Sequence, residues 1–220
     1  MDFKKKKYTV MRQAISKDLA AFVANYFRMQ KQVYDTCRAT RYISPFEDMI
    51  GHYEAKNEQI PETYSHYANI AMETLMLKCQ PEMEKVTGLK LYPAYTYARI
   101  YKKGDVLKRH KDRFSCEIST TMNLGGDDWP IYLSPNENVG IPDGKKITTT
   151  SQAKGIKVDL KPGDMLVYSG CELEHWREKF KGKECIQVFL HYNNRKTQGA
   201  KDNMFDKRPH LGLPSWFSKK

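Results

Sequence analysis

The second half of the chain contains a series of short β-prone segments, and this series restricts the possible folds more than any other feature of the sequence. The segments are residues 89–101, 106–110, 116–124, 130–133, 156–160, 164–168, 171–176 and 185–192. Turn-forming sequences such as KKGD, GGDDWP, KPGD and KGKE separate them. Many short strands at this spacing are typical of an antiparallel sandwich or jelly roll.

The first half of the chain has helical periodicity. Ser16 is a suitable N-cap, and apolar residues at helical spacing predict a helix from about residue 17 to 36. A second helix is expected from Pro61 or Thr63 to Gly88, with a break or kink at Pro81. The apolar stripes of both helices are expected to pack on a sheet, which predicts an α+β fold.

The chain length of 220 residues fits a single domain. We expect residues 1–88 to be mainly helical support, residues 89–193 to form the β core and residues 194–220 to form a C-terminal tail. The predicted loops 38–60 and 134–154 are polar or mixed in charge. The second is long enough to be a lid or substrate loop, and simple surface decoration is an equal alternative.

The composition narrows the class of protein. No apolar run approaches the roughly 20 residues that span a bilayer, so no membrane segment is expected. The five cysteines are scattered and include no CxxC pair, which predicts a reducing, cytoplasmic location without a disulfide framework. The net charge of +11 is compatible with an acidic partner such as nucleic acid, although solvated lysines also explain it.

A candidate metal site begins at His110 and Asp112. Two residues apart on a strand, they project from one face. The next strand alternates polar residues with apolar ones. The polar positions are Ser119, Thr121 and Asn123, and the apolar positions are Ile118, Met122 and Leu124. One face of that strand is therefore expected to pack on helices and the other to line a polar cavity.

The third metal ligand is either His175 or His191. A facial arrangement of two imidazoles and one carboxylate is the Fe(II) site that leaves positions open for other ligands. Lys183 favours His175, because a lysine at the head of the strand that follows can pair with a carboxylate bound beside the metal. For His191, the nearest later lysine, Lys201, lies in the polar tail.

These residues resemble the Fe(II)/2-oxoglutarate-dependent dioxygenases, above all their prolyl-4-hydroxylase-like branch with its bacterial and phage members. The resemblance rests on the residues Tyr101, His110, Asp112, Gly163, Asp164, His175 and Lys183 and covers about residues 89–193. It implies a double-stranded β-helix, or jelly roll, with N-terminal helices packed on one sheet.

The resemblance also implies roles for individual residues. His110, Asp112 and His175 would hold Fe(II), and Lys183 would bind the distal carboxylate of the cosubstrate 2-oxoglutarate. Tyr101, together with Thr121 or Ser119, would contact the cosubstrate.

The implied reaction uses O₂ and hydroxylates a C–H bond of a prolyl-like peptide side chain or an amino-acid-like molecule, with release of succinate and CO₂. The alternatives are an oxidative nucleic-acid demethylase of the same superfamily, a non-catalytic basic β-domain that binds nucleic acid, and a cupin-type metal protein. The demethylase branch typically carries two arginines after the distal histidine, and this chain has no RxxxxxR spacing there.

Overall fold

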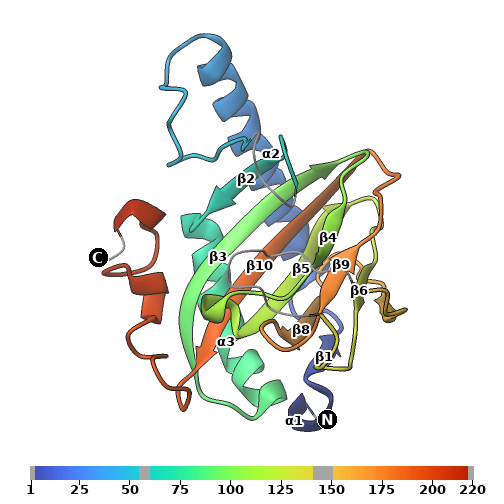
Figure 1. The fold of residues 1–220 in the computed structure, drawn as a ribbon. Coiled ribbons are helices and arrows are strands. Elements are labelled where there is room, and N and C mark those ends of the chain that lie inside the picture. The colour runs from blue at the N-terminus through green and yellow to red at the C-terminus, as the bar shows by residue number, and fades with distance from the viewer. Residues whose placement is uncertain (1–2, 55–59, 141–150, 218–220) are drawn as a thin grey trace.

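A computed structural model describes residues 3–54, 60–140 and 151–217 (Figure 1). Its strands are β1 (Tyr8–Met11), β2 (Tyr64–Tyr67), β3 (Leu91–Lys102), β4 (Leu107–His110), β5 (Ile118–Gly126), β6 (Ile131–Leu133), β7 (Ile156–Val158), β8 (Met165–Ser169), β9 (His175–Arg177) and β10 (Glu184–Asn194). Its α-helices are α1 (Phe3–Lys6), α2 (Lys17–Ala39) and α3 (Ile70–Thr87). Three 3₁₀ turns are η1 (Phe114–Cys116), η2 (Met204–Lys207) and η3 (Ser215–Phe217).

The strands form two antiparallel sheets. The large sheet has the order β1-β8-β5-β10-β3-β2, and the small sheet has the order β4-β9-β6-β7. Each of the eight β-prone segments forms one of the strands β3 to β10, four in each sheet. The predicted α+β jelly roll is therefore confirmed. Strands β1 and β2 extend the large sheet at its two edges.

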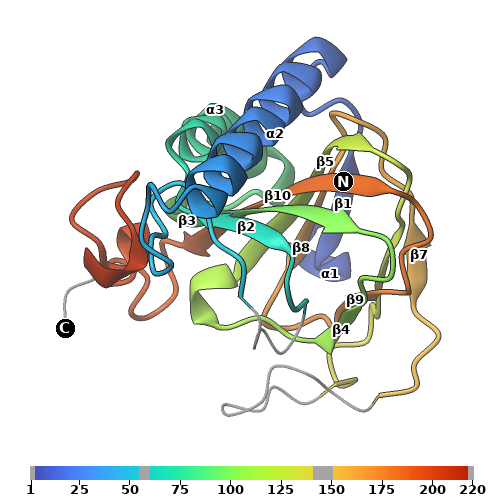
Figure 2. The same cartoon turned by 90° about the horizontal axis from the view of Figure 1, so that it is seen from above.

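Helices α2 and α3 lie together over one face of the large sheet (Figure 2). The main hydrophobic core is formed between this face and the helices, and it includes Ile118, Met122 and Leu124 of β5. The alternate residues Ser119 and Thr121 are buried on the opposite face, between the sheets. The predicted division of β5 into an apolar and a polar face is thus confirmed.

The start of the second helix was predicted incorrectly. Residues from Tyr64 to Tyr67 pair with β3 as an edge strand, and α3 begins only at Ile70. The Asn69 side chain caps the helix by accepting from the amides of Ala71 and Met72. At the other end, Gly88 adopts the left-handed conformation of a helix C-cap, as expected.

Pro81 does not interrupt α3. A proline inside a helix leaves the carbonyl four residues earlier without its amide partner. Here that residue is Leu77, which is exposed, so water can solvate its carbonyl. The expected break at Pro81 therefore does not occur.

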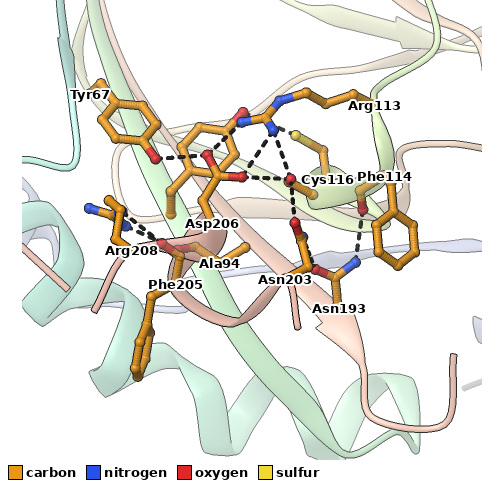
Figure 3. A network of polar contacts seen from close by, with 12 residues as sticks. Tyr67, Ala94, Arg113, Phe114, Cys116, Asn193, Asn203, Phe205, Asp206 and Arg208 are labelled. Atoms are coloured by element: carbon orange, nitrogen blue, oxygen red, sulfur yellow. Dashed lines mark hydrogen bonds and ion pairs between the residues drawn. The ribbon is translucent and has the colours of Figure 1, made fainter. Parts of the chain in front are cut away.

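The segment after β10 folds back onto the body through polar contacts (Figure 3). Asp206 accepts hydrogen bonds from Arg113, Ser115 and Tyr67. Arg208 forms a buried ion pair with Glu73 of α3, with an Nη2–Oε1 distance of 2.7 Å. The aromatic residues Trp216 and Phe217 remain largely exposed. Polar and charged contacts thus attach this segment, together with Leu211, which packs against the main core.

The predicted loops 38–60 and 134–154 are largely irregular where the structure describes them, and residues 55–59 and 141–150 lie outside the described part. Within the described chain, no helix is both long and apolar enough to cross a bilayer.

Candidate metal and cosubstrate site

His110, Asp112 and His175 meet between the two sheets. The Nε2 atoms of His110 and His175 lie 3.5 and 3.4 Å from Asp112 Oδ1. The pairing of β4 with β9 places the two histidines directly opposite each other. Asp112 follows the end of β4, where its amide donates to the carbonyl of Gly170. These three side chains form a group whose ligand atoms all lie within 4.8 Å of one another.

Backbone carbonyls orient both imidazoles. His110 Nδ1 lies 2.8 Å from the Lys108 carbonyl oxygen, and His175 Nδ1 lies 3.0 Å from that of Leu173. A carbonyl can only accept, so each Nδ1 carries a proton and the lone pair of a neutral ring is on Nε2. Both Nε2 atoms point toward Asp112. This is the arrangement in which a histidine binds a metal ion while its other nitrogen is held by the protein.

The charges of the group favour a cation between them. Burial alone would raise the pKa of Asp112, but the imidazoles of His175 and His110 hold it well below its usual value. Asp112 is therefore ionised near neutral pH. Burial lowers the pKa of His110, and the neighbouring His175 lowers it further, so His110 is neutral. Burial also opposes the charge on His175, yet Asp112 outweighs it and raises the pKa of His175.

Ser119 and His191 form a second layer behind Asp112. The Ser119 hydroxyl lies 3.0 Å from Asp112 Oδ2 and 2.9 Å from His191 Nδ1. The two histidines that competed as the third ligand thus have different places. His175 is beside His110, with ring centroids 4.1 Å apart, whereas His191 contacts Ser119. His191 also belongs to a second possible ligand group, with Asp112 and Cys116.

Gly170 is required for this arrangement by close packing. A Cβ atom at this position would collide with the carbonyl oxygen of Cys116, with Asp112 Oδ2 and with the Ser119 hydroxyl. The glycine therefore lets the backbone approach the carboxylate closely enough for the Asp112 amide to bond to its carbonyl.

A fully buried arginine lies two residues after His175 on the same strand. Arg177 is 1% exposed, and among the described residues no carboxylate pairs with it. Its guanidinium donates to Thr121 Oγ1 at 3.0 Å, to Gln187 Oε1 at 3.3 Å and to the Trp129 carbonyl, while Nε has no partner. Burial lowers the pKa of Arg177, and the groups that oppose this effect include no acid.

The residues predicted to contact a cosubstrate have separate positions. Tyr101 is buried beside Trp129, with ring centroids 4.8 Å apart, and its hydroxyl has no hydrogen-bond partner among the described residues. Thr121 contacts Arg177, whereas Ser119 contacts the metal-ligand group. A buried guanidinium and a buried hydroxyl without full hydrogen bonding are costly unless a ligand completes them.

Lys183 does not join this group, in contrast to the expectation from the sequence. Its side chain is exposed, and it precedes β10 in a turn where its backbone amide donates to Asp127. The buried inward face of the strand begins only with Cys185. The sequence reasoning missed Arg177, although the alternation of strand residues places His175 and Arg177 on one face.

Comparisons with known proteins give matches by structure but not by sequence. No family model matches the chain, and no curated protein matches it. Solved structures do match. A Pseudomonas putida prolyl-4-hydroxylase is 14% identical, with a TM-score of 0.55 over 88% of this chain and 96% of that one. AviO1 from Streptomyces viridochromogenes Tue57 is 12% identical, with a TM-score of 0.62 over 90% and 94%.

The structures of two further neighbours contain ligands. The epimerase SnoN in complex with Fe³⁺, α-ketoglutarate and nogalamycin RO is 10% identical, with a TM-score of 0.63 over 87% of this chain and 80% of that one. HygX from Streptomyces hygroscopicus, with nickel, 2-oxoglutarate and hygromycin B bound, is 13% identical, with a TM-score of 0.57 over 88% and 85%. The fold is that of the 2-oxoglutarate-dependent oxygenases.

Proposed function

We propose that this protein is an Fe(II)- and 2-oxoglutarate-dependent oxygenase that hydroxylates a C–H bond of a prolyl-like peptide side chain or an amino-acid-like molecule. The observation that carries the proposal is the combination of two side chains on strand β9. One is a histidine of a two-histidine, one-carboxylate group, and the other is a buried arginine that no carboxylate of the described residues pairs with. The fold, which solved 2-oxoglutarate oxygenases share, supports it.

The three ligand residues fit Fe(II). Two neutral imidazoles and one carboxylate form the facial set that is typical of non-haem Fe(II) oxygenases and leaves open positions for a cosubstrate and O₂. His110, Asp112 and His175 supply this donor set from a buried site, and carbonyl contacts already orient both rings. Ser119 holds the second carboxylate oxygen of Asp112, which fixes the orientation of that ligand.

Arg177, and not Lys183, is the residue that we assign to the distal carboxylate of 2-oxoglutarate. Its guanidinium is buried, is oriented by Thr121 and Gln187, and lies on the strand of His175. Arginine can bind a carboxylate through two parallel hydrogen bonds, which a lysine cannot do. The Tyr101 hydroxyl lies near the guanidinium groups of both Arg177 and Arg99, and no well-formed hydrogen bond to the described residues occupies it, so it is a further donor for the same carboxylate.

When bound, Fe(II) and 2-oxoglutarate supply O₂-dependent oxidation, in which the keto acid is converted to succinate and CO₂ and one oxygen atom enters the substrate C–H bond. The protein contributes binding, orientation and the exclusion of water. The ligand residues and Arg177 are buried or nearly so, and aromatic rings surround them: Tyr168 lies 4.7 Å from His175 between ring centroids, and Trp129 lies 5.1 Å from the guanidinium.

Two measurements test the proposal. Anaerobic addition of Fe(II) and 2-oxoglutarate to the purified protein should produce a weak visible charge-transfer band. Absence of the band with folded protein would overturn the proposal. Succinate release should then be measured against peptides, amino acids and nucleic acids. Stimulation by nucleic acids alone would favour the demethylase reaction over hydroxylation of a prolyl-like substrate.

A further inference from the structure

Arg99 is a second buried arginine for which the described residues offer no carboxylate partner. It lies on β3, is 8% exposed, and points to the same side of the sheet as Tyr97 and Tyr101. Its Nε donates to the Ser65 hydroxyl at 3.2 Å, and its guanidinium carbon lies 4.9 Å from the centroid of the Tyr97 ring. Neutral hydroxyls and rings do not neutralise a guanidinium, so its charge is uncompensated within the described chain.

The other arginines in comparable positions are compensated. Arg208 is also buried, and it pairs with Glu73 at 2.7 Å. Arg113 is more exposed, and it too pairs with a carboxylate by binding both oxygens of Asp206. Burying an unpaired charge costs several kcal/mol per ion even after relaxation. Arg99 therefore has the character of Arg177, a cation that an anion from outside the chain completes.

Arg99 and Arg177 both lie near the Tyr101 hydroxyl, but their hydrogen bonds go to different residues. Gln187, which contacts Arg177, is opposite Arg99 on β10, but the hydrogen bond of Arg99 goes to Ser65 on the other side, in the edge strand β2. This hydrogen bond of Arg99 is thus directed toward the edge of the large sheet. His52 also lies there, with its Nε2 atom 3.1 Å from the Tyr97 hydroxyl.

The same face of β3 leads from Arg99 toward the metal-ligand group. Tyr95 and Tyr97 precede Arg99 at alternate positions of the strand. The centroid of the Tyr95 ring lies 4.5 Å from that of His191, which contacts Ser119. Four residues of a strand span about 13 Å. A molecule that reaches from the metal-ligand group to Arg99 therefore lies over tyrosine rings and has its anionic end several bonds away from the reacting carbon.

We propose that Arg99, together with Ser65, Tyr97 and His52, binds a carboxylate or phosphate group of the substrate. This inference rests on the proposed function and narrows its substrate class to acids whose charge is remote from the oxidised C–H bond. The 2-oxoglutarate carboxylate is assigned to Arg177, so the two unpaired arginines serve two different ligands.

The test uses protein loaded with Ni(II) and 2-oxoglutarate, in which no turnover occurs, and isothermal titration calorimetry. The first pair of probes is the dipeptide acetyl-Pro-Gly with a free C-terminal carboxylate and the same dipeptide as its neutral amide. The second pair is phenyl phosphate and neutral phenol. We expect an anionic probe to bind at least tenfold more tightly than its neutral counterpart. The preferred anion then distinguishes a carboxylic from a phosphorylated substrate.

The variants Arg99→Met, Arg99→Lys and Lys103→Met complete the test. Arg99→Met should weaken binding of the anionic probe at least tenfold, and Arg99→Lys should weaken it less. Lys103→Met is the control: it removes an exposed positive charge just after β3 and should leave the affinity unchanged. Circular dichroism and thermal melting check folding, and Arg99→Lys serves if the methionine variant is unstable. The affinity for 2-oxoglutarate should change by less than twofold in each variant.

Three results would count against these assignments. Equal binding of anionic and neutral probes, or an anionic affinity that Arg99→Met leaves unchanged, would overturn the substrate subsite alone. A large loss of 2-oxoglutarate affinity in Arg99→Met would also overturn it, by placing Arg99 in the cosubstrate site. Failure of the unaltered protein to bind 2-oxoglutarate would instead overturn the proposed function.

Discussion

Two regions of this molecule differ in how they neutralise the charge of their arginines. At the C-terminal segment, Arg208 pairs with Glu73. Arg113 pairs with Asp206 of the same segment (Figure 3). Between the sheets, Arg177 and Arg99 have hydroxyl, amide and ring contacts but no carboxylate among the described residues. In the first region each arginine has a carboxylate partner, whereas in the second the described residues supply none.

This difference separates residues that hold the fold from residues that bind ligands. A buried ion pair costs stability when one partner is removed, because the other charge is left uncompensated. A buried cation without a partner already carries that cost, so its removal should relieve the protein and weaken a ligand. The absence of a carboxylate partner thus distinguishes the arginines that bind ligands from those that stabilise the fold.

The largest effect is expected at the metal ligands. His175→Ala should abolish Fe(II) binding, because only two ligand side chains would remain, whereas His191→Ala should retain binding at an affinity about tenfold lower, as is usual for residues that orient a ligand. Equilibrium dialysis with metal analysis measures both. Binding by His175→Ala together with loss in His191→Ala would show that the second group, with Asp112 and Cys116, is the metal site.

Removing Arg208 should reduce the stability of the fold. In Arg208→Met the Glu73 carboxylate remains buried without its partner, and we expect a loss of about 3–5 kcal/mol in the free energy of unfolding. The double variant Glu73→Met, Arg208→Met is the control and should recover much of the loss. Urea denaturation measures both, and a single variant as stable as the unaltered protein would contradict the structural role.

Removing Arg177 should have the opposite pattern. In Arg177→Met, the ligand-free protein should be as stable as before or more so, while 2-oxoglutarate affinity falls about 30-fold or more, since truncating one side of a buried charge pair costs at least about 2 kcal/mol. Lys183→Met is the matched control, because Lys183 is exposed. If Lys183→Met weakens 2-oxoglutarate and Arg177→Met does not, the assignment of Arg177 is wrong.

A smaller, pH-dependent effect is expected at Asp206. Burial would raise its pKa, but Arg113, Ser115 and Tyr67 lower it from 3.8 to about 2. A lowered pKa stabilises the fold above the unfolded value, and the contribution is lost as the pH falls from about 4 to about 2. Asp206→Asn should therefore be about 2 kcal/mol less stable at pH 7. In denaturation experiments, a difference from the unaltered protein that persists at pH 2 would exclude this ionisation as the cause.

The sequence by itself determined the features that depend on local pattern. The eight β-prone segments, the helix after Ser16 and the two faces of β5 follow from residue periodicity and turn signals, and each occurs in the structure. The His110 and Asp112 pair could be identified for the same reason, since its two members are close in the chain.

Only the tertiary structure decided which distant residues meet. Residues 64–67 form a strand because β3 offers them a pairing edge, which no local signal before α3 reveals. Lys183 does not point into the interior because β10 begins only at Glu184, which leaves Lys183 in the preceding turn. The buried cation is Arg177. Burial and the absence of a partner are properties of side chains brought together from separate strands, so the unpaired state of Arg177 and Arg99 could be recognised only in the folded molecule.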